Sequence, residues 1–431
     1  MSVKIDLSDK TGKFTAPSAP KGTKDILPSQ IYKWHFVEQV FKEICAAYGF
    51  KEIRTPVFEH TELFTRGVGD TTDIVEKQMY TFEDYAKRSI TLKPEGTAPI
   101  VRAFVEHKQY AEIQPAKLFY NIPCFRYEKP QSGRLRQFHQ FGIEVFGTEN
   151  VMADAEVISL ARDFLDRLGI KDVELRINSI GCPECRQTHR KVLREFLKDK
   201  YDDLCDTCKG RYERNPLRIL DCKSEICQKL VTGAPVMLDY LCASCGDAFE
   251  ELQINLKALE IDYIIDSGIV RGLDYYTKTA FEFVSSNIGA QGTVCGGGRY
   301  DHLIEQLGGP PIPGVGFGLG IERLLLVMEA NGVEIPEVDG TDVFIAVMGE
   351  KAKIFGLSLT RKLRKQGIKA EMDVLCRNIK GQFKYADRLN AKYTVVIGDN
   401  ELSEGNITLK NMRTSEQFLI AIDDLVKEIT K

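Results

Sequence analysis

The stretch that most constrains the fold is residues 125–147, which reads FRYEKPQSGRLRQFHQFGIEVFG. Its second half has the two-residue period of a β-strand, with different kinds of side chain on its two faces. Residues 129–134 between the halves are polar and contain Pro, Ser and Gly, so we predict a β-hairpin with a turn there. One face of the second strand carries Arg136, Phe138, Gln140 and Glu144, and the other carries Gln137, His139, Phe141, Ile143 and Val145.

The charged face of this hairpin is poorly suited to core packing, because buried charges are costly unless they are paired. It suits a ligand better. Phe138 can stack on a flat base, Arg126 on the first strand can bind a phosphate through two hydrogen bonds, and Glu144 can hold an ammonium group. A hairpin with one solvated face explains the same pattern, so this alternative stays open when the hairpin is taken alone.

Two further segments combine glycine with charged side chains. In residues 91–103 a strand ends at Pro94 and a helix begins near Thr97, which can cap that helix, while Glu95 at the same bend can face a cleft. Residues 314–320 have glycine at every second position, so one strand face carries no side chains and a flat ligand can approach the backbone. Arg323 then projects from the first turn of the next helix.

The charge distribution separates the C-terminal part from the rest. The net charge is −4, but residues 341–431 hold 16 Lys and Arg against 12 Asp and Glu, which is +4 and leaves −8 for the remainder. A mildly basic end favours a polyanionic partner there. We predict strands at 343–347, 369–374 and 394–398 and helices at 351–367, 379–390 and 415–429. This alternation indicates a small α/β domain at 342–431, behind a linker at 332–341.

The second of these helices carries a cationic stripe, defined by Lys380, Lys384 and Arg388. The three residues recur every four positions and therefore share one helix face. A solvated face is the default explanation for such a stripe.

The N-terminal residues 1–20 are polar, and we expect a mobile arm. They include acidic residues and no apolar core, so neither a secretory nor a mitochondrial signal is evident. No apolar run approaches membrane-spanning length. We therefore expect a soluble, cytoplasmic protein without membrane contact, whose 12 cysteines are thiols or metal ligands rather than disulfides.

Most cysteines crowd into residues 182–258, where we expect a mainly helical inserted domain. The eight are Cys182, Cys185, Cys205, Cys208, Cys222, Cys227, Cys242 and Cys245. Three Cys-x-x-Cys pairs and two further cysteines have the spacing of structural zinc sites. Reduced thiols without a ligand explain the composition equally, so both interpretations stay open.

Five segments together resemble the signatures of a known family. The stretch ending at Pro56, the hairpin with its FRYE sequence at 125–128, and residues 318–323, GLGIER, resemble the three motifs of class II aminoacyl-tRNA synthetases. Residues 271–276, RGLDYY, and 297–301, GGRYD, resemble the two signatures of the histidine-tRNA ligase family. The similarity runs from about Lys21 to the C-terminus, so it covers nearly the whole chain.

The resemblance implies a fold and an activity. The expected fold is an α+β catalytic domain at 21–331 with a six- or seven-stranded antiparallel sheet, the inserted helical domain, and a C-terminal α/β anticodon-binding domain. The expected activity is ligation of L-histidine to histidine tRNA by a homodimer, using ATP with Mg²⁺ and a histidyl-adenylate intermediate. Some family members lack the cysteines described above, so the resemblance does not imply zinc.

The resemblance also implies roles for twelve residues. Arg126 and Arg271 would be catalytic cations at the α-phosphate, and both would contact histidine. ATP would further be held by Glu128 and Phe138 at the adenine and by Arg323 at the outer phosphates. Histidine would be held by Glu95 and Tyr276 at the ring, by Thr97, Gln140 and Glu144 at the α-amino group, and by Tyr275 and Tyr300 along the pocket wall.

One rival function comes from another class of protein. A regulatory subunit of ATP phosphoribosyltransferase, which acts in histidine biosynthesis without being a synthetase, keeps the same catalytic fold. Such proteins usually lack the anticodon-binding domain and break the catalytic signatures, whereas this sequence has both. A P-loop kinase or ATPase is disfavoured, because G-x-x-x-x-G-K-[ST] does not occur in the sequence.

Overall fold

The computed structural model describes residues 16–69, 72–222, 224–286, 292–337 and 340–430. The chain divides into two compact units, residues 1–335 and 336–431, and each has its own hydrophobic core. Of the polar arm expected at 1–20, residues 1–15 lie outside the described residues. Among the helices described, none is both long and apolar enough to cross a membrane.

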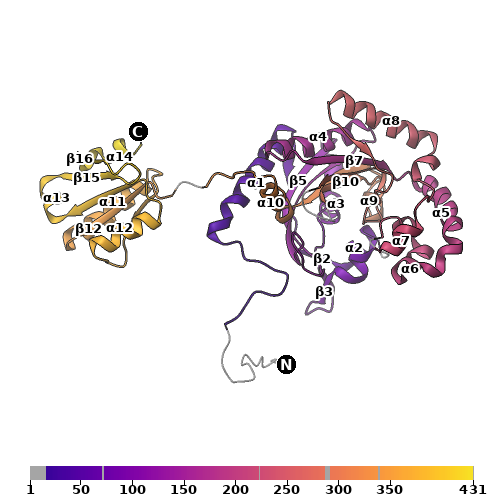
Figure 1. The fold of residues 1–431 in the computed structure, drawn as a ribbon, viewed down its shortest axis with the longest axis horizontal. Helices are drawn as coiled ribbons and strands as arrows, with labels where there is room; N and C mark the ends of the chain where they lie inside the picture. Colours follow the sequence, from indigo (N-terminus) through magenta and orange to yellow (C-terminus); the bar gives the residue numbers. More distant parts are fainter. Residues whose placement is uncertain (1–15, 70–71, 223, 287–291, 338–339, 431) are drawn as a thin grey trace, which may run out of the picture. The chain divides into compact units, whose positions relative to one another are not determined.

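The first unit is built on an eight-stranded sheet (Figure 1). In spatial order its strands are β1 (Lys51–Glu52), β5 (Ala116–Phe125), β6 (Gln137–Phe146), β11 (Gly314–Gly320), β10 (Thr293–Arg299), β9 (Thr277–Ser285), β7 (Val173–Ser179) and β8 (Ile264–Ile265). The six long strands from β5 to β7 pair antiparallel, as the resemblance predicts. The two-residue strands β1 and β8 add parallel edges that the sequence analysis did not anticipate.

The predicted hairpin is formed by β5 and β6, which pair from Phe125 and Gln137 down to Ala116 and Phe146. The connection spans residues 126–136 and is longer than the predicted turn at 129–134, so Arg126 and Arg136 lie just outside the strands. Its apolar face is buried in the main core beneath helices α1 (Pro28–Ala47) and α4 (Met152–Arg167). Phe141 stacks on Phe41 of α1 with ring centroids 4.3 Å apart. This burial fixes the strand register, because a shift by one residue would turn the charged face into the core.

The opposite face of the sheet carries a second core cluster. Helices α3 (Thr97–Glu106) and α9 (Leu303–Gln306) contribute to it, and α2 (Thr61–Gly67) packs nearby with a small three-stranded sheet. The strands of that sheet are β2 (Phe58–His60), β4 (Ser89–Leu92) and β3 (Tyr80–Glu83), and the short π-helix η1 (Ile74–Gln78) precedes β3. Helix α10 (Ile321–Ala330) follows β11 directly.

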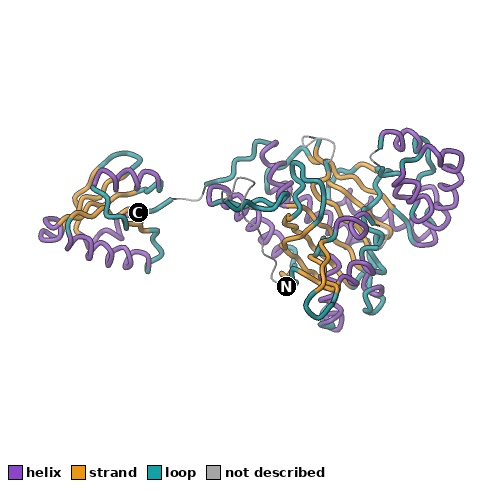
Figure 2. The backbone as a smooth tube through the Cα atoms, turned by 90° about the horizontal axis from the view of Figure 1, so that it is seen from below, coloured by secondary structure: helices purple, strands orange, loops and turns teal. Residues whose placement is uncertain are grey.

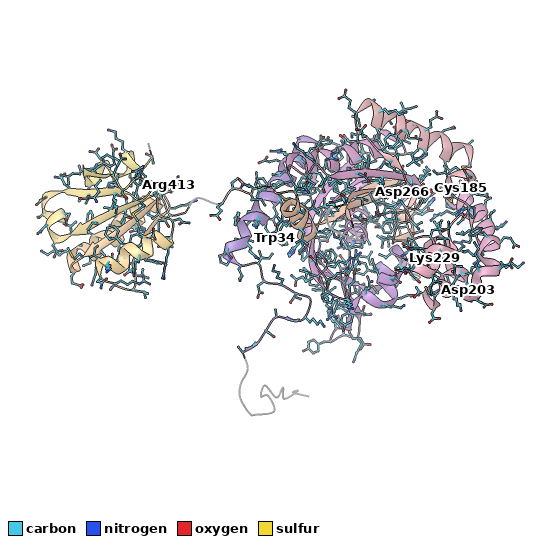
Figure 3. The ribbon with its side chains drawn as sticks, viewed as in Figure 1. Trp34, Cys185, Asp203, Lys229, Asp266 and Arg413 are labelled. Carbon is cyan, nitrogen blue, oxygen red and sulfur yellow. The ribbon has the colours of Figure 1, made fainter. Side chains whose placement is uncertain are left out.

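Between β7 and β8 the chain forms a helical segment (Figures 1 and 2). Its helices are α5 (Pro183–Leu197), η3 (Lys198–Asp203), α6 (Asp206–Arg214), η4 (Pro216–Ile219), α7 (Glu225–Leu230), η5 (Met237–Tyr240) and α8 (Ala243–Ala258). Cys185, Asp203 and Lys229 mark this segment in Figure 3. The segment has two small buried clusters of its own, both rich in cysteine.

The second unit is an α/β sandwich on a five-stranded sheet. Its strands, in spatial order, are β13 (Ala370–Met372), β12 (Val343–Met348), β14 (Tyr393–Gly398), β15 (Asn406–Asn411) and β16 (Gln417–Ala421). Its helices are α11 (Glu350–Arg364), α12 (Ile379–Arg388), α13 (Asp399–Glu404), η6 (Ile422–Asp424) and α14 (Leu425–Ile429). Alternate residues of β12 pack with α11 and α12, so these helices cover opposite faces (Figure 2).

The predicted helix at 415–429 is wrong. Residues 417–421 form β16, which pairs antiparallel with β15 along its whole length, and only 425–429 are α-helical. The sequence QFLIA is compatible with a helix or a strand. It forms a strand here because its backbone hydrogen-bonds to the edge of β15.

Candidate active site

A cavity of about 360 Å³ opens on the charged face of the hairpin. It lies among β6, β9, β10 and β11, the first turns of α3 and α10, and the loop before β9. Ten of the twelve residues expected at a ligand site line it: Glu95, Thr97, Arg126, Glu128, Phe138, Gln140, Arg271, Tyr275, Tyr276 and Arg323. The other two, Glu144 and Tyr300, are buried next to these residues.

Three arginines in the cavity wall are each held by a neighbouring group. Arg126 Nε donates to the carbonyl oxygen of Pro94 at 2.8 Å, and its guanidinium lies 5.2 Å from the centre of the Phe138 ring. Arg323 Nη1 donates to the carbonyl oxygen of Thr293 at 2.7 Å. Because these bonds use only part of each guanidinium, the remaining N–H groups are positioned for an anion in the cavity.

The third cation, Arg271, is held by a carboxylate that sequence reasoning missed. Its Nη1 donates to Glu282 Oε1, while Glu282 Oε2 accepts a hydrogen bond of 2.8 Å from Thr293. The guanidinium lies 5.3 Å from the centre of the Tyr276 ring. Gly296 allows this position, because a Cβ there would come within 3.0 Å of the guanidinium nitrogens. Glu282 lies on β9, and the glycine opposite it, Gly296, is the only feature of the sequence that points to it.

Glu128 lies at the hairpin end of the cavity, between two cations. Its Oε2 accepts a hydrogen bond of 3.0 Å from Arg134, and its Oε1 is 3.9 Å from Arg126 Nη1. Arg134 also lines the cavity but was assigned only to the polar turn. The turn folds back over the site, which the residue spacing alone does not reveal.

The inner end of the cavity is a cluster of buried carboxyl and phenol groups. Tyr120 donates to Glu144 Oε1 at 3.0 Å, and Tyr300 donates to Glu144 Oε2. Burial raises the pKa of Glu144 to about 8, although these phenols oppose the shift. The ring of Tyr275 lies 4.7 Å from that of Tyr276 and 5.5 Å from that of Tyr300, measured between centroids.

Glu95 caps helix α3, which corrects the expectation that Thr97 does so. Its two carboxylate oxygens accept hydrogen bonds from the backbone N–H groups of Thr97, at 2.8 Å, and Ala98, at 2.7 Å. A carboxylate two residues before the helix satisfies two of its free N–H groups, so the hydroxyl of Thr97 is not needed there. Burial raises the pKa of Glu95, opposed by these N–H groups and by the charge of Arg126.

The glycine face of β11 is only partly open, contrary to the prediction. A Cβ on Gly314 would come within 3.0 Å of Tyr300, one on Gly316 within 3.0 Å of Glu144, and one on Gly318 within 3.0 Å of Gln140. Gly320 alone of the four has open space, with nothing described within 4 Å of its Cβ position. Most of the face therefore makes room for the protein's own polar side chains, and a ligand can approach only at Gly318 and Gly320, which line the cavity.

Tyr120 is the site residue that sequence reasoning missed most clearly. It lies on β5 opposite Gly142, and its ring fills the space that a Cβ on Gly142 or on Gly96 would need. The sequence contains one indication of Tyr120. Gly142 lies between Gln140 and Glu144 on the charged face, and a side chain from a neighbouring strand must fill the space that this glycine leaves.

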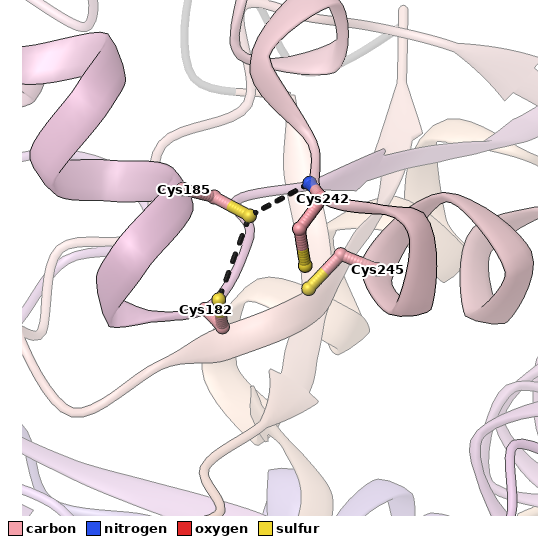
Figure 4. Close-up of side chains that lie close together, drawn as sticks. All are labelled: Cys182, Cys185, Cys242 and Cys245. Carbon is pink, nitrogen blue, oxygen red and sulfur yellow. Dashed lines mark hydrogen bonds between the residues drawn. The ribbon is translucent and has the colours of Figure 1, made fainter.

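The eight clustered cysteines form two separate groups of four. One comprises Cys182, Cys185, Cys242 and Cys245 (Figure 4), and the other comprises Cys205, Cys208, Cys222 and Cys227. Within each group the sulfur atoms all lie within 4.8 Å of one another. Both groups lie in the helical segment, apart from the residues that line the cavity.

Comparison with known proteins gives one family. Residues 22–324 match the family model described as histidyl-tRNA synthetase, and residues 342–431 match an anticodon binding domain. A histidine-tRNA ligase of Caldanaerobacter subterraneus subsp. tengcongensis is 61% identical over 411 residues, which cover 95% of this chain and 99% of the relative.

Solved structures agree with this result. The apo histidyl-tRNA synthetase of S. aureus superposes with a TM-score of 0.83 at 42% identity, over 96% of this chain and 100% of that one. A Bacillus halodurans protein described as an ATP phosphoribosyltransferase regulatory subunit/histidyl-tRNA synthetase superposes with a TM-score of 0.61 at 22% identity, over 88% and 97%, and shares the fold. By sequence and by structure, the chain belongs to the histidyl-tRNA synthetase family.

Proposed function

We propose that this protein ligates L-histidine to histidine tRNA in two steps, through a histidyl-adenylate intermediate. The observation that carries the proposal is the cavity itself, in which Arg126, Arg271 and Arg323 share one space with Glu95 and the inner cluster around Glu144. Cations at one end suit a nucleotide phosphate, and buried acceptors at the other suit a small cationic amino acid. The 61% identical relative named histidine-tRNA ligase supports the same activity.

In the first step, a carboxylate oxygen of histidine attacks the α-phosphorus of ATP and pyrophosphate leaves. Negative charge grows on the phosphate oxygens during the attack, so fixed guanidinium groups lower the barrier. Arg126 and Arg271 serve the α-phosphate, and Arg323 serves the outer phosphates. ATP would be bound as its Mg²⁺ complex, in which the ion would neutralise part of the phosphate charge.

Histidine is selected by hydrogen bonds rather than by size. Glu95 and Tyr276 bind the two ring nitrogens, so an amino acid that lacks such groups forgoes both hydrogen bonds in a buried site. Gln140, Thr97 and the Glu144 carboxyl group bind the α-amino group. Tyr275 lines the pocket, while Tyr300 acts by orienting Glu144 through their hydrogen bond.

The adenine ring stacks on Phe138 and is bounded by Glu128. In the second step, a hydroxyl of the terminal ribose of the tRNA attacks the histidyl carbonyl carbon and AMP leaves. We assign the catalytic domain to 21–331, with 182–258 inserted, and anticodon binding to 342–431 behind a linker at 332–341. The active form is a homodimer that works in the cytoplasm.

The regulatory-subunit alternative is less supported. The cavity is lined by the three arginines to which this proposal assigns adenylation, and residues 342–431 match an anticodon binding domain. The structure whose description names that subunit is only 22% identical, so it shares the fold without supporting the function.

Pyrophosphate exchange into ATP tests the proposal. The purified full-length protein is assayed with each of the standard amino acids in turn. We expect exchange with histidine alone. Exchange with a different amino acid would refute the assigned specificity, and a folded protein inactive with every amino acid would favour the regulatory-subunit function.

A further inference from the structure

The spacing of the sulfur atoms in the helical segment matches metal coordination. The sulfurs of Cys182 and Cys185 are 3.5 Å apart, and those of Cys205 and Cys222 are 3.9 Å apart. Four thiolates arranged tetrahedrally about 2.3 Å from one Zn²⁺ lie about 3.8 Å from each other. All eight cysteines are free. Within each group of four, the sulfur atoms need to move little to bind one common ion.

Both groups lie where the backbone offers hydrogen-bond donors to sulfur. Cys182, Cys205 and Cys242 are the residues that immediately precede helices α5, α6 and α8, where unpaired N–H groups attract negative charge. Two further backbone N–H groups donate to sulfur, that of Cys242 to Cys185 at 3.1 Å and that of Cys205 to Cys227 at 3.4 Å. Such N–H···S bonds orient and stabilise metal-binding thiolates.

Apart from α8, which packs Phe249, Leu252 and Leu256 into the main core, the helical segment has only small apolar clusters. One cluster has only Cys185, Met237 and Cys245 as buried members. The other has seven buried residues, of which three are cysteines. A segment that buries so little apolar surface needs another source of stability, and a bound metal supplies it.

We propose that each group of four cysteines binds one structural Zn²⁺. The proximal site, defined by Cys182, Cys185, Cys242 and Cys245, ties the start of α5 to the start of α8 and so joins the two ends of the helical segment (Figure 4). The distal site, defined by Cys205, Cys208, Cys222 and Cys227, closes the loop that contains α6 and η4. A cubane iron–sulfur cluster is too large for sulfurs within 4.8 Å of each other.

The loop closed by the distal site contacts the catalytic machinery. Arg211 donates to Asp73, which precedes the π-helix η1, at 2.9 Å, and Arg214 donates to Glu76 within η1 at 2.6 Å. Asn215 Nδ2 donates to Asp274 at 2.9 Å, and Arg218 Nη1 donates to the carbonyl oxygen of Gly272 at 3.0 Å.

These last two bonds hold the loop that follows Arg271. On the basis of the proposed function, the distal zinc is therefore a positioning element for that catalytic arginine, whereas the proximal zinc is purely structural.

Metal analysis tests the sites independently of activity. Protein expressed with zinc should hold two zinc ions per chain, one for each cysteine group. The double variants Cys182→Ser/Cys185→Ser and Cys205→Ser/Cys208→Ser should each lose one ion, while the exposed Cys376→Ser control should keep both. Where a variant fails to fold, cobalt exchanged into the native protein should give the spectrum of tetrahedral cobalt thiolate. Absence of zinc after equilibration with it, or iron in its place, would overturn the proposal.

Amide hydrogen exchange distinguishes the roles of the distal and proximal zinc sites. Loss of the distal ion should speed amide exchange at residues 271–276 and lower kcat/KM for histidine-dependent pyrophosphate exchange about tenfold. Loss of the proximal ion should leave exchange at 271–276 unchanged. Equal effects of both variants there would overturn the positioning role. Two bound zinc ions without histidine-dependent activity would instead refute the proposed function and leave the metal sites standing.

Discussion

Among single residues, Arg271 depends most on its surroundings. Its guanidinium is bound by Glu282, lies over the Tyr276 ring, and occupies space that exists only because position 296 is glycine. A cation fixed in this way needs little reorganisation when negative charge develops on a phosphate. The surrounding residues therefore fix the position of the positive charge before the reaction begins.

Replacing Arg271 with alanine should abolish adenylation without unfolding the protein. We expect histidine-dependent pyrophosphate exchange to fall by at least about 100-fold, because one preorganised charge is lost from the transition state. Arg88→Ala, which removes an exposed arginine paired with Asp84, is the control and should retain full exchange. Near-normal exchange in Arg271→Ala would show that this residue does not serve the α-phosphate.

Glu144 should make stability depend on pH. Its pKa of about 8 in the folded protein exceeds the ordinary value of 4.5, so the folded state keeps a proton that the unfolded chain releases. Stability from this group is thus complete below pH 4.5 and is lost as the pH rises toward about 8. Thermal unfolding of the wild type and Glu144→Gln across this range should show the wild type losing its relative advantage as the pH rises. Parallel curves would contradict the assignment.

Where a side chain belonged to a recognisable motif, the sequence predicted its position at the cavity, although not its role. The charged face of the hairpin correctly placed Phe138 and Gln140 at a cavity. Tyr120 and Glu282 were missed. Tyr120 fills a gap left by Gly142 on another strand, and Glu282 lies opposite Gly296, whose missing side chain leaves room for Arg271. Both relations depend on strand order, which is not visible in the residue spacing.

Among the strands, β11 contributes to the site through the glycines on one of its faces. They leave room for Tyr300, Glu144 and Gln140, so the strand shapes the inner end of the cavity by lacking side chains. The sequence predicted the strand with its correct bounds but not the occupant of its face, because the occupants come from β6 and from the end of β10.

Gly316→Ala tests this role of β11. The added Cβ would lie within 3.0 Å of Glu144 and of the backbone oxygen of Ile143, so we expect destabilisation of about 3 kcal/mol. Gly320→Ala on the same strand meets no described atom within 4 Å and should unfold at the wild-type temperature. Calorimetry of both variants is the measurement, and equal unfolding temperatures would exclude the crowding at Gly316.

In the second unit, sequence reasoning found the three parallel strands but failed at 415–429. Strands β12, β13 and β14 are separated by helices, which gives a clear alternating pattern. The β14–β15–β16 part instead depends on antiparallel pairing between neighbours, which local residue preference does not determine.

At the scale of the whole molecule, the two units have separate cores, so their contributions to the reaction can be separated. We expect adenylation to need only the cavity of the first unit. We expect recognition of the tRNA to need the second unit as well, whose helix α12 carries the exposed cationic stripe.

Reversing charge on this stripe should affect the tRNA alone. In Lys380→Glu/Lys384→Glu we expect KM for tRNA to rise about tenfold, because phosphate contacts are lost, with pyrophosphate exchange unchanged. Lys362→Glu/Lys365→Glu is a matched control at exposed positions at the end of α11, on the opposite face of the sheet. Identical tRNA kinetics in both variants would show that the stripe is a solvated helix face that does not bind tRNA.

One cavity should hold histidine and ATP together in a reactive arrangement. The decisive measurement is a crystal structure of the protein with histidine and a non-hydrolysable ATP analogue. We predict the imidazole about 3 Å from Glu95 and Tyr276, and the α-phosphate between Arg126 and Arg271. Histidine bound elsewhere, or an α-phosphate that neither arginine contacts, would contradict the account.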